Sequence, residues 1–155
     1  MIPDFKNVRN SSWALLPPGI YDSTLVEVFN RYVINARREA LFRGMERALD
    51  NLFKSGCTQV YLDGSYVTAK PLPNDYEICW DPKFVNLYAL DPVFLDFSNG
   101  TRPQKQKYLG EFFPSTSIEG NSMQPFLNFF QTDKESGKAK GIIRLFNHIM
   151  KGGAI

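Results

Sequence analysis

A hydrophobic segment that ends in a Gly-Ser turn, followed closely by a segment with two carboxylates, most restricts how this chain can fold. Residues 62–67 read Leu-Asp-Gly-Ser-Tyr-Val, and residues 74–78 read Asn-Asp-Tyr-Glu-Ile. Side chains two residues apart on a strand point to the same face, so Asp75 and Glu77 are expected to project together. Carboxylates fixed side by side hold either a shared proton or a divalent cation.

The turn at Gly64 and Ser65 adds a second element to this pattern. A small turn lets a polyphosphate approach the backbone, and it offers N–H and hydroxyl donors. Together the two segments predict a site for a metal-bound nucleoside triphosphate. The competing interpretation is a solvated hairpin with ordinary acidic residues, because short motifs also match by chance.

Length and composition restrict the class of protein. The 155 residues are expected to form one domain, residues 1–155. Charge is balanced, with 18 basic and 16 acidic residues, which does not indicate a dedicated nucleic-acid-binding surface. Cys57 and Cys79 lack metal-ligand spacing, so they are expected to be reduced, buried thiols of a cytoplasmic protein. No signal peptide is apparent, and the apolar runs are too short to span a membrane.

The two ends of the chain are expected to be irregular. Residues 1–22 contain three prolines and a Pro-Gly step, so they predict an arm that wraps across the domain. Residues 151–155 contain two consecutive glycines and predict a mobile tail. The apolar anchors of the arm are Phe5, Trp13, Leu15 and Leu16.

A long helix is expected after the arm. Thr24 and Glu27 form a capping box, and Ser55-Gly56 follows the last periodic residues, so the helix should run to about Lys54. Its basic side chains are most simply a solvated face, although a role in binding nucleic acid or another partner is an alternative. These basic residues are Arg31, Arg37, Arg38, Arg43 and Arg47.

The rest of the chain alternates between short strands and helices. This pattern predicts an α/β fold, with a small mixed β-sheet and helices packed on it. The expected strands are residues 59–62, 75–80 and 108–113, and residues 141–145 form a last strand or helix. A helix is expected over residues 84–97, interrupted near Asp91-Pro92. The basic segment 100–107 is expected to be a helix or a loop, and residues 126–131 a helix or a strand. Residues 133–140 are expected to form a charged turn.

This layout resembles the DNA polymerase beta-like nucleotidyltransferase superfamily, particularly its minimal stand-alone prokaryotic members. Those proteins carry a Gly-Ser turn, then a carboxylate-x-carboxylate strand, then a third carboxylate on a later strand. The matching residues here are Gly64, Ser65, Asp75 and Glu77. The chain is also similar to an uncharacterised family of small nucleotidyltransferase-like proteins over residues 16–19, 27–38, 63–68, 110–114 and 129–142.

The resemblance implies a metal-dependent transfer of a nucleoside monophosphate from a nucleoside triphosphate to a hydroxyl of a protein, an RNA or a small molecule. Asp75, Glu77 and Glu111 would be the catalytic and metal-binding residues, with Mg²⁺ or Mn²⁺ as cofactor. The nucleotide would contact Gly64, Ser65 and Lys70. Stand-alone relatives of this size often act in toxin–antitoxin or phage-defence modules, so a toxin, an antitoxin or a modified target is a possible protein partner.

Two positions of the implied site are ambiguous. The family usually has Asp where this chain has Glu77, and Mg²⁺ tolerates altered geometry poorly. Glu77 is therefore expected to weaken metal binding, to favour Mn²⁺ or to mark a degenerate site. The third carboxylate is either Glu111, on a strand-like segment, or Asp96, and Glu111 fits the order along the chain better. Further phosphate clamps could come from Arg102, Lys105 or Lys107.

A binding module is the alternative to an enzyme. Glu77, the small size and a group of aromatic residues fit a degenerate fold that binds a partner protein without turnover. His148, the single histidine, is expected to be a surface residue, and the segment around Asp133 to be a turn without calcium ligands. The aromatic residues are Phe112, Phe113, Phe126, Phe129 and Phe130.

Overall fold

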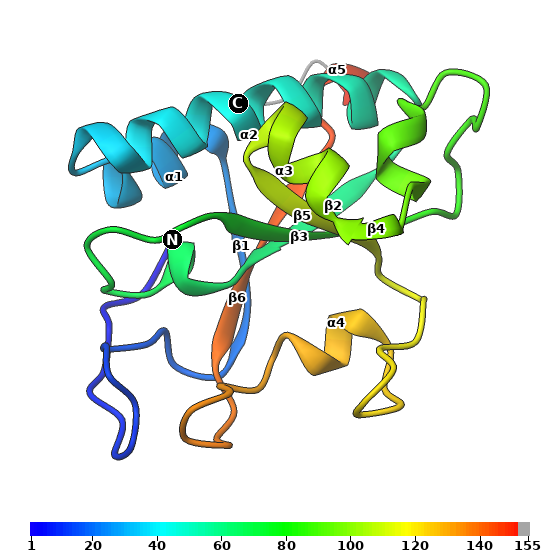
Figure 1. The fold of residues 1–155 in the computed structure, drawn as a ribbon. Coiled ribbons are helices and arrows are strands. Elements are labelled where there is room, and N and C mark those ends of the chain that lie inside the picture. The colour runs from blue at the N-terminus through cyan, green and yellow to red at the C-terminus, as the bar shows by residue number, and fades with distance from the viewer. Residues whose placement is uncertain (152–155) are drawn as a thin grey trace.

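The computed structural model describes residues 1–151 and has the expected α/β fold (Figure 1). A mixed five-stranded sheet has the strand order β1-β6-β2-β3-β5. β1 pairs with β6 in parallel and β3 with β5 in parallel, while β2 is antiparallel to both β6 and β3. The strands are β1 (Gly19–Ser23), β2 (Gln59–Asp63), β3 (Tyr76–Trp80), β5 (Gly110–Pro114) and β6 (Gly141–Phe146).

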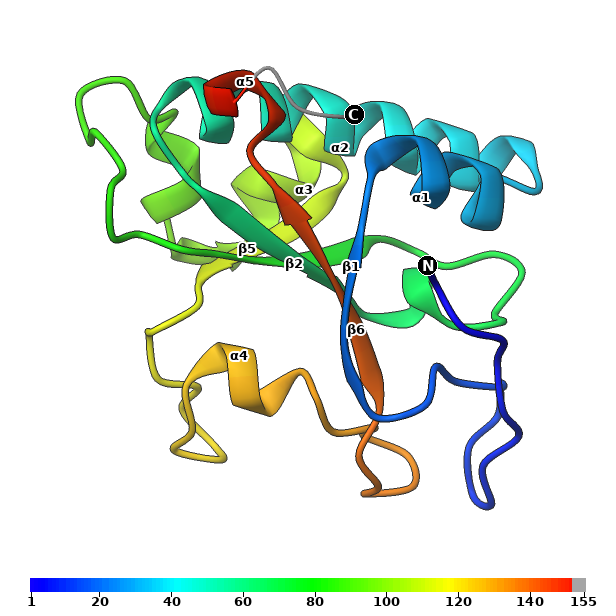
Figure 2. The ribbon, with the colours of Figure 1, turned by 180° about the vertical axis from the view of Figure 1, so that it is seen from behind.

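Helices cover the two faces of the sheet very unequally. Among the described helices, α1, α2, α3 and α5 lie on one face, and only the short helix α4 lies on the other (Figures 1 and 2). The helices are α1 (Leu25–Tyr32), α2 (Ala36–Lys54), α3 (Arg102–Tyr108), α4 (Phe126–Phe129) and α5 (His148–Lys151). Shorter elements are the 3-10 turns η1 (Ser65–Val67) and η2 (Pro92–Leu95) and the strand β4 (Ser98–Thr101).

Residues that alternate along the strands point to opposite faces of the sheet, which pack in two separate apolar clusters. Leu62, Ile78 and Phe112 belong to the main core between the sheet and the helices. Their neighbours on the same strands point to the opposite face, where a smaller apolar cluster packs under α4. On that face Tyr61, Cys79, Phe113, Phe126 and Phe130 meet.

The predicted long helix is in fact two helices. Thr24 caps α1, and its side chain accepts the N–H of Glu27, as the capping box predicts. α1 ends at Tyr32, and Asn35 caps α2 by accepting the N–H of Arg38. The capping preference of Asn35 thus outweighs the helical periodicity that continues through this segment. The predicted end of the helix at Lys54 is confirmed.

The prediction of an irregular arm over residues 1–22 is wrong for its last part. Residues 19–23 form β1, paired with β6 at the edge of the sheet. Leu15 and Leu16 are buried anchors as expected, but Trp13 is 44% exposed. Lys151 ends α5, and the rest of the predicted tail, residues 152–155, lies outside the described residues.

The helix expected over residues 84–97 is also wrong. Only η2 is helical there, because Asp91 caps that turn and Pro92 begins it. Residues 102–108 and 126–129 are helical, and residues 141–146 form a strand. Cys57 and Cys79 are buried free thiols, as predicted. His148 is half-buried rather than a simple surface residue, and its ring meets the ring of Phe53 edge to face at 5.6 Å.

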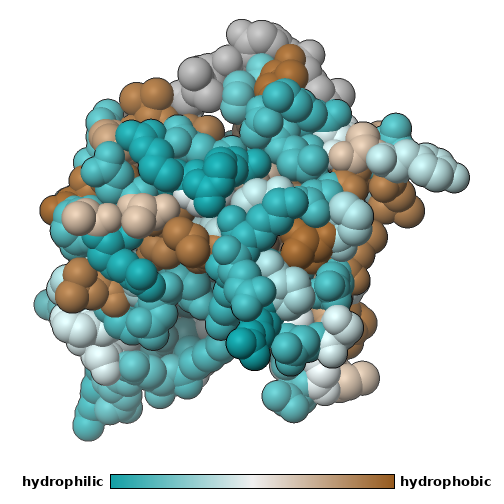
Figure 3. Space-filling view, turned by 45° about the horizontal axis from the view of Figure 1, so that its top comes forward, coloured by the Kyte–Doolittle hydropathy of each residue, from teal (hydrophilic) through white to brown (hydrophobic). Residues whose placement is uncertain are grey.

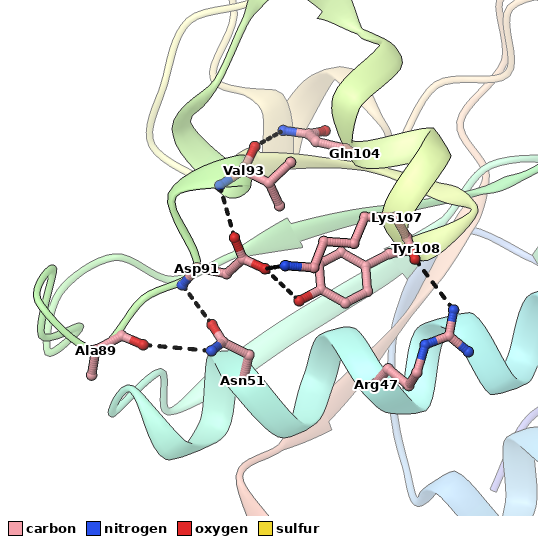
Figure 4. Close-up of polar contacts among 8 residues, drawn as sticks. All are labelled: Arg47, Asn51, Ala89, Asp91, Val93, Gln104, Lys107 and Tyr108. Carbon is pink, nitrogen blue, oxygen red and sulfur yellow. Dashed lines mark hydrogen bonds and ion pairs between the residues drawn. The ribbon is translucent and has the colours of Figure 1, made fainter.

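A polar network fixes α3 against α2 (Figure 4). The Asp91 carboxylate accepts the Tyr108 hydroxyl at 2.6 Å and pairs with Lys107. Asn51 of α2 accepts the backbone N–H of Asp91 at 2.8 Å. The buried side chain of Gln104 joins α3 to η2 and to β5 through Val93 and Phe112. These contacts determine where the first turn of α3 lies relative to β5.

The outer surface of the helical layer is mostly hydrophilic (Figure 3). Charged residues of α2 such as Glu39, Arg43 and Asp50 are exposed there. Among the described residues, no helix combines the length and apolar character that crossing a membrane requires.

Candidate functional site

Three carboxylates stand side by side across the sheet on the face opposite the helical layer. Asp63 of β2 is the register partner of Glu77 of β3, and Glu77 is the register partner of Glu111 of β5. Side chains at paired positions of neighbouring strands share a face, so the three form one row. Asp75 precedes Glu77 by two residues and therefore adds a fourth carboxylate on the same side.

Asp75, Glu77 and Glu111 form the compact part of this group. Each offers a carboxylate oxygen, and these oxygens all lie within 4.8 Å of one another. All three residues are half-buried. Lys105 of α3 approaches them, with Nζ 3.2 Å from Asp75 Oδ2 and 3.7 Å from Glu111 Oε1. Thr101 donates its hydroxyl to Glu111 at 2.6 Å.

Burial is the main cause of the raised pKa values of the carboxylates in this site. Burial, reinforced by Asp63, raises the pKa of Glu77 to about 8. Burial and the nearby Glu111 raise the pKa of Asp75, although Lys105 opposes the shift. Burial also raises the pKa of Asp63, against the attraction of Lys140, whose Nζ lies 3.3 Å from Asp63 Oδ1. A bound cation would relieve the repulsion among these carboxylates.

Gly64 brings the backbone directly against the carboxylates. Its φ is +83°, and a Cβ atom there would lie 3.3 Å from Oε2 of Glu77. Glycine adopts this conformation without steric cost and leaves room for Glu77. Ser65 then opens η1, so its backbone and hydroxyl border the same space.

Arg38 holds the segment after this turn, which corrects its assignment to a solvated face. Its side chain is 1% exposed and donates to the carbonyls of Tyr66, Thr68 and Lys70 at 2.7, 3.0 and 2.6 Å. It also donates to Tyr32 at 3.4 Å. The exposed Arg37 donates to the carbonyls of Pro73 and Asn74. α2 therefore positions the loop that links the Gly64 turn to Asp75.

A cleft of about 310 Å³ lies beside the Gly64 turn, and we call it the lysine cleft. The Gly64 turn and the carboxylates of Asp75 and Glu77 form one wall, and the loop of residues 133–140 forms another. Ser12 of the arm donates to Glu135 of this loop through its N–H and hydroxyl, at 2.6 and 3.1 Å. The lining residues used below are Gly64, Ser65, Lys70, Asp75, Glu77 and Lys134.

A second cleft, of about 530 Å³, lies on the other side of the carboxylates, and we call it the aromatic cleft. Phenylalanine rings of β5 and the α4 region form much of it. Glu77 and Lys134 line both clefts, so the two spaces meet at the carboxylates. The other lining residues are Glu111, Phe113, Glu119, Asn121, Phe126, Phe129 and Phe130.

Most of the candidate residues expected from the sequence lie together. Asp75, Glu77 and Glu111 form one group, and Gly64, Ser65 and Lys70 line the adjoining cleft. Asp96, the alternative third carboxylate, lies outside the group and accepts hydrogen bonds from Ser98. Of the candidate basic clamps, Lys105 contacts the carboxylates, whereas Lys107 pairs with Asp91.

Sequence reasoning missed three residues of the site: Asp63, Lys134 and Lys140. Asp63 directly precedes the Gly64 turn, and its alternation with Leu62 was the available signal for the carboxylate face. Lys134 and Lys140 belong to the charged turn that the sequence predicts at residues 133–140, but only the folded chain brings this turn to the carboxylates.

Comparison with known proteins supplies a family but no activity. Residues 6–146 match one protein family, described as a family of unknown function (DUF6932). Neither a curated protein nor a solved structure matches the chain. Since the family match spans most of the 155 residues, this chain belongs to the DUF6932 family.

Proposed function

We propose that this chain is a metal-dependent nucleotidyltransferase, which moves a nucleoside monophosphate from a nucleoside triphosphate to a hydroxyl group. The observation that carries the proposal is the group of Asp75, Glu77 and Glu111, whose carboxylate oxygens lie within 4.8 Å of one another beside a glycine turn. The resemblance of the same residues to the DNA polymerase beta-like superfamily supports it. The acceptor hydroxyl belongs to a protein, an RNA or a small molecule.

The carboxylates fit a divalent cation. Mg²⁺ and Mn²⁺ prefer oxygen ligands, and three carboxylates offer up to six oxygens. The raised pKa of Asp75 reflects burial and the charge of Glu111, and that of Glu77 reflects burial and the charges of Asp63 and Glu111. A cation would offset these effects. Asp75, Glu77 and Glu111 would hold the ion. When bound, it would neutralise charge that develops on the phosphates and on the leaving pyrophosphate.

The chain's own groups have definite roles in this reaction. The Gly64 N–H and the Ser65 hydroxyl donate to the phosphates, and Lys70 and Lys134 balance their charge. The acceptor oxygen forms a bond to the α-phosphorus while the bond between that phosphorus and the β-bridging oxygen breaks. Pyrophosphate leaves with the electron pair, and Glu111 accepts the proton of the hydroxyl.

The test is turnover of nucleoside triphosphates labelled at the α-phosphate, in Mg²⁺ and in Mn²⁺. We expect pyrophosphate release and label transfer by the native protein. Asp75→Asn should lower the rate about a hundredfold or more, because it removes a charged ligand. Asp96→Asn is the matched control and should keep the native rate. Native turnover by Asp75→Asn would contradict the proposal.

The position of Lys105 favours a second candidate function, a binding module without turnover. Its ammonium group already pairs with Asp75 and Glu111, so the chain supplies a cation of its own to the carboxylates. In this alternative the fold acts by binding a partner protein. A stoichiometric partner that co-purifies with both native protein and Asp75→Asn would support the module, and a partner carrying an added nucleotide mass would support the enzyme.

A further inference from the structure

We propose that the aromatic cleft receives the base of the nucleotide, while its phosphates lie in the lysine cleft. This inference rests on the proposed function, and it assigns the direction in which the substrate lies across the carboxylates. Its basis is that Glu77 and Lys134 line both clefts, so one elongated ligand can occupy the two spaces at once.

The sheet places rings next to the carboxylate row. Glu77 and Glu111 are register partners, and two residues further along the same strands Cys79 pairs with Phe113. Two residues of a strand span about 7 Å, so the ring of Phe113 lies one step beyond the carboxylates on the same face. In a nucleotide only the ribose separates the base from the α-phosphate. A phosphate at the carboxylates therefore brings the base to the rings.

The rings form a rigid wall. Phe113 stacks on Phe126, with centroids 4.2 Å apart and an interplanar angle of 14°. Phe129 meets Phe126 edge to face at 6.4 Å. All three side chains remain half-exposed, although they pack against the small apolar cluster under α4. Phe113 is already stacked on both Phe126 and Phe97, whereas Phe129 has only edge-on or tilted ring contacts among the described residues. Phe129 is therefore the ring of this wall on which a base can stack.

The charges of the aromatic cleft favour a base over a nucleic-acid strand. Glu77, Glu111 and Glu119 line it, against the single cation Lys134. A phosphate backbone would be repelled there, whereas a neutral heterocycle would not. The exposed amide of Asn121 offers both a donor and an acceptor to the edge of a base.

Lys134 connects the two halves of the site. Its Nζ lies 5.6 Å from the centroid of the Phe129 ring, and the same side chain lines the lysine cleft. It therefore lies at the junction of the two clefts, close to the ring proposed for the base and to the half of the site proposed for the phosphates. Because the Phe129 ring lies next to Lys134 at the junction of the clefts, Phe129 is the best single position at which to test stacking.

Inorganic tripolyphosphate separates the two halves, because it carries the phosphates without a base. Calorimetric titration in Mn²⁺ should show that each nucleoside triphosphate binds the native protein about tenfold more tightly than tripolyphosphate. Phe129→Leu keeps apolar volume but removes the ring, and it should abolish this preference without changing the affinity for tripolyphosphate. Asn121→Ala, at an exposed position, should weaken nucleotide binding less than Phe129→Leu does. It should likewise leave the affinity for tripolyphosphate unchanged.

Phe84→Leu is the matched control, because Phe84 is exposed and lies outside both clefts. Equal affinities of native protein and both cleft variants for nucleotides would overturn the proposed orientation. The proposed orientation would also be overturned if Phe129→Leu slowed transfer to an acceptor without weakening nucleotide binding. The aromatic cleft would then hold the acceptor. If the native protein binds neither nucleotides nor tripolyphosphate, the proposed function itself fails.

Discussion

Lys105 lies against the carboxylates that would hold the proposed metal ion. Its ammonium group lies 3.2 Å from Asp75 and 3.7 Å from Glu111, two of the three carboxylates that would hold the ion. The lysine therefore competes with a divalent cation for the same oxygens. A site that carries its own counter-ion is stable without metal and has a weakened affinity for it.

Lys105→Gln should consequently raise the affinity for Mn²⁺ alone by about tenfold, which corresponds to ~1.4 kcal/mol. It should also lower the stability of the metal-free protein, because the carboxylates lose their nearest cation. Calorimetric titration with Mn²⁺ measures the first effect and urea unfolding the second. Lys107→Gln, on the same helix but paired with Asp91, should leave Mn²⁺ affinity unchanged. Equal affinities for the two variants would contradict the competition.

The raised pKa of Glu77 predicts a pH-dependent stability. Burial and Asp63 move this pKa from 4.5 to about 8, so the folded protein holds a proton that the unfolded chain releases. Without metal, the free energy of unfolding should therefore fall as pH rises from about 4.5 to about 8, by roughly 2–4 kcal/mol. Glu77→Gln should flatten this part of the profile, as measured by urea unfolding at a series of pH values.

Glu119→Gln is the control for this profile. Backbone N–H groups of Ser122 and Asn121 lower the pKa of Glu119, so its titration lies below the window in which Glu77 acts. The variant should reproduce the native slope between pH 5 and pH 8. A slope that survives Glu77→Gln unchanged would assign the effect to other groups.

Single residues of the site differ in how far the sequence reveals them. Asp75 and Glu77 are predictable because the period of a strand is a local property. Glu111 follows from its order along the chain in the resemblance. The sequence indicated Lys105 only as one of several candidate phosphate clamps. Its contact with Asp75 was not predictable, because that contact depends on how α3 packs. Asp63 becomes part of the row only through the register of β2 with β3, which no local pattern encodes.

At the scale of the element, α2 serves the site from the opposite face of the sheet. Arg38 donates from this helix to the carbonyls of three alternate residues after Gly64, and its guanidinium lies 4.9 Å from the Tyr66 ring centroid. Arg38 holds the first part of the loop before Asp75, and Arg37 holds its last two residues.

Arg38→Met should lower the free energy of unfolding by roughly 3–5 kcal/mol, because it leaves buried carbonyls without donors. Nucleotide binding should weaken as well, since Lys70 and the turn lose their support. Arg37→Met makes the matched comparison: Arg37 is exposed, and water can replace its bonds, so we expect a loss of at most about 1 kcal/mol. Urea unfolding compares the two variants, and a similar small loss in both would refute the role of Arg38.

Close packing of α3 on α2 gives a second prediction at this scale. A Cβ atom on Gly44 would clash with the Tyr108 carbonyl oxygen, a backbone atom that cannot rotate away. Gly44→Ala should therefore destabilise by roughly 1–3 kcal/mol, although alanine by itself favours helix. Gly120→Ala, where nothing lies within 4 Å of an added Cβ, should be nearly neutral in the same unfolding measurement. A more stable Gly44→Ala protein would contradict the packing.

Elements were predictable where the signal is local. The capping box at Thr24, the stop after Lys54 and the strand that begins at residue 76 all follow from residues within a few positions. The break at Asn35 was missed because periodic apolar residues continue through it. β1 was missed because its five residues form a strand only by pairing with β6, more than a hundred residues away in the chain.

At the scale of the whole molecule, the sheet separates the main core from the candidate site. The helical layer and the main core lie on one face, whereas the carboxylates and both clefts lie on the other. The α/β class was predictable from the alternating pattern, but the strand order β1-β6-β2-β3-β5 depends on contacts between distant segments. The carboxylates gathered on the face away from the helical layer repel one another, and this repulsion lowers the stability of the fold. Such a loss of stability is typical of binding sites.

Electron paramagnetic resonance of Mn²⁺ tests this assignment most directly, because the signal of free Mn²⁺ disappears on binding. Titrations of the native protein, Asp75→Asn and Asp96→Asn should be carried out without nucleotide, because a nucleoside triphosphate binds Mn²⁺ itself and removes the free-ion signal. We expect the native protein and Asp96→Asn to bind Mn²⁺, and Asp75→Asn to lose most of this binding. Equal binding by all three proteins, or none by the native protein, would show that the carboxylate group is not a metal site.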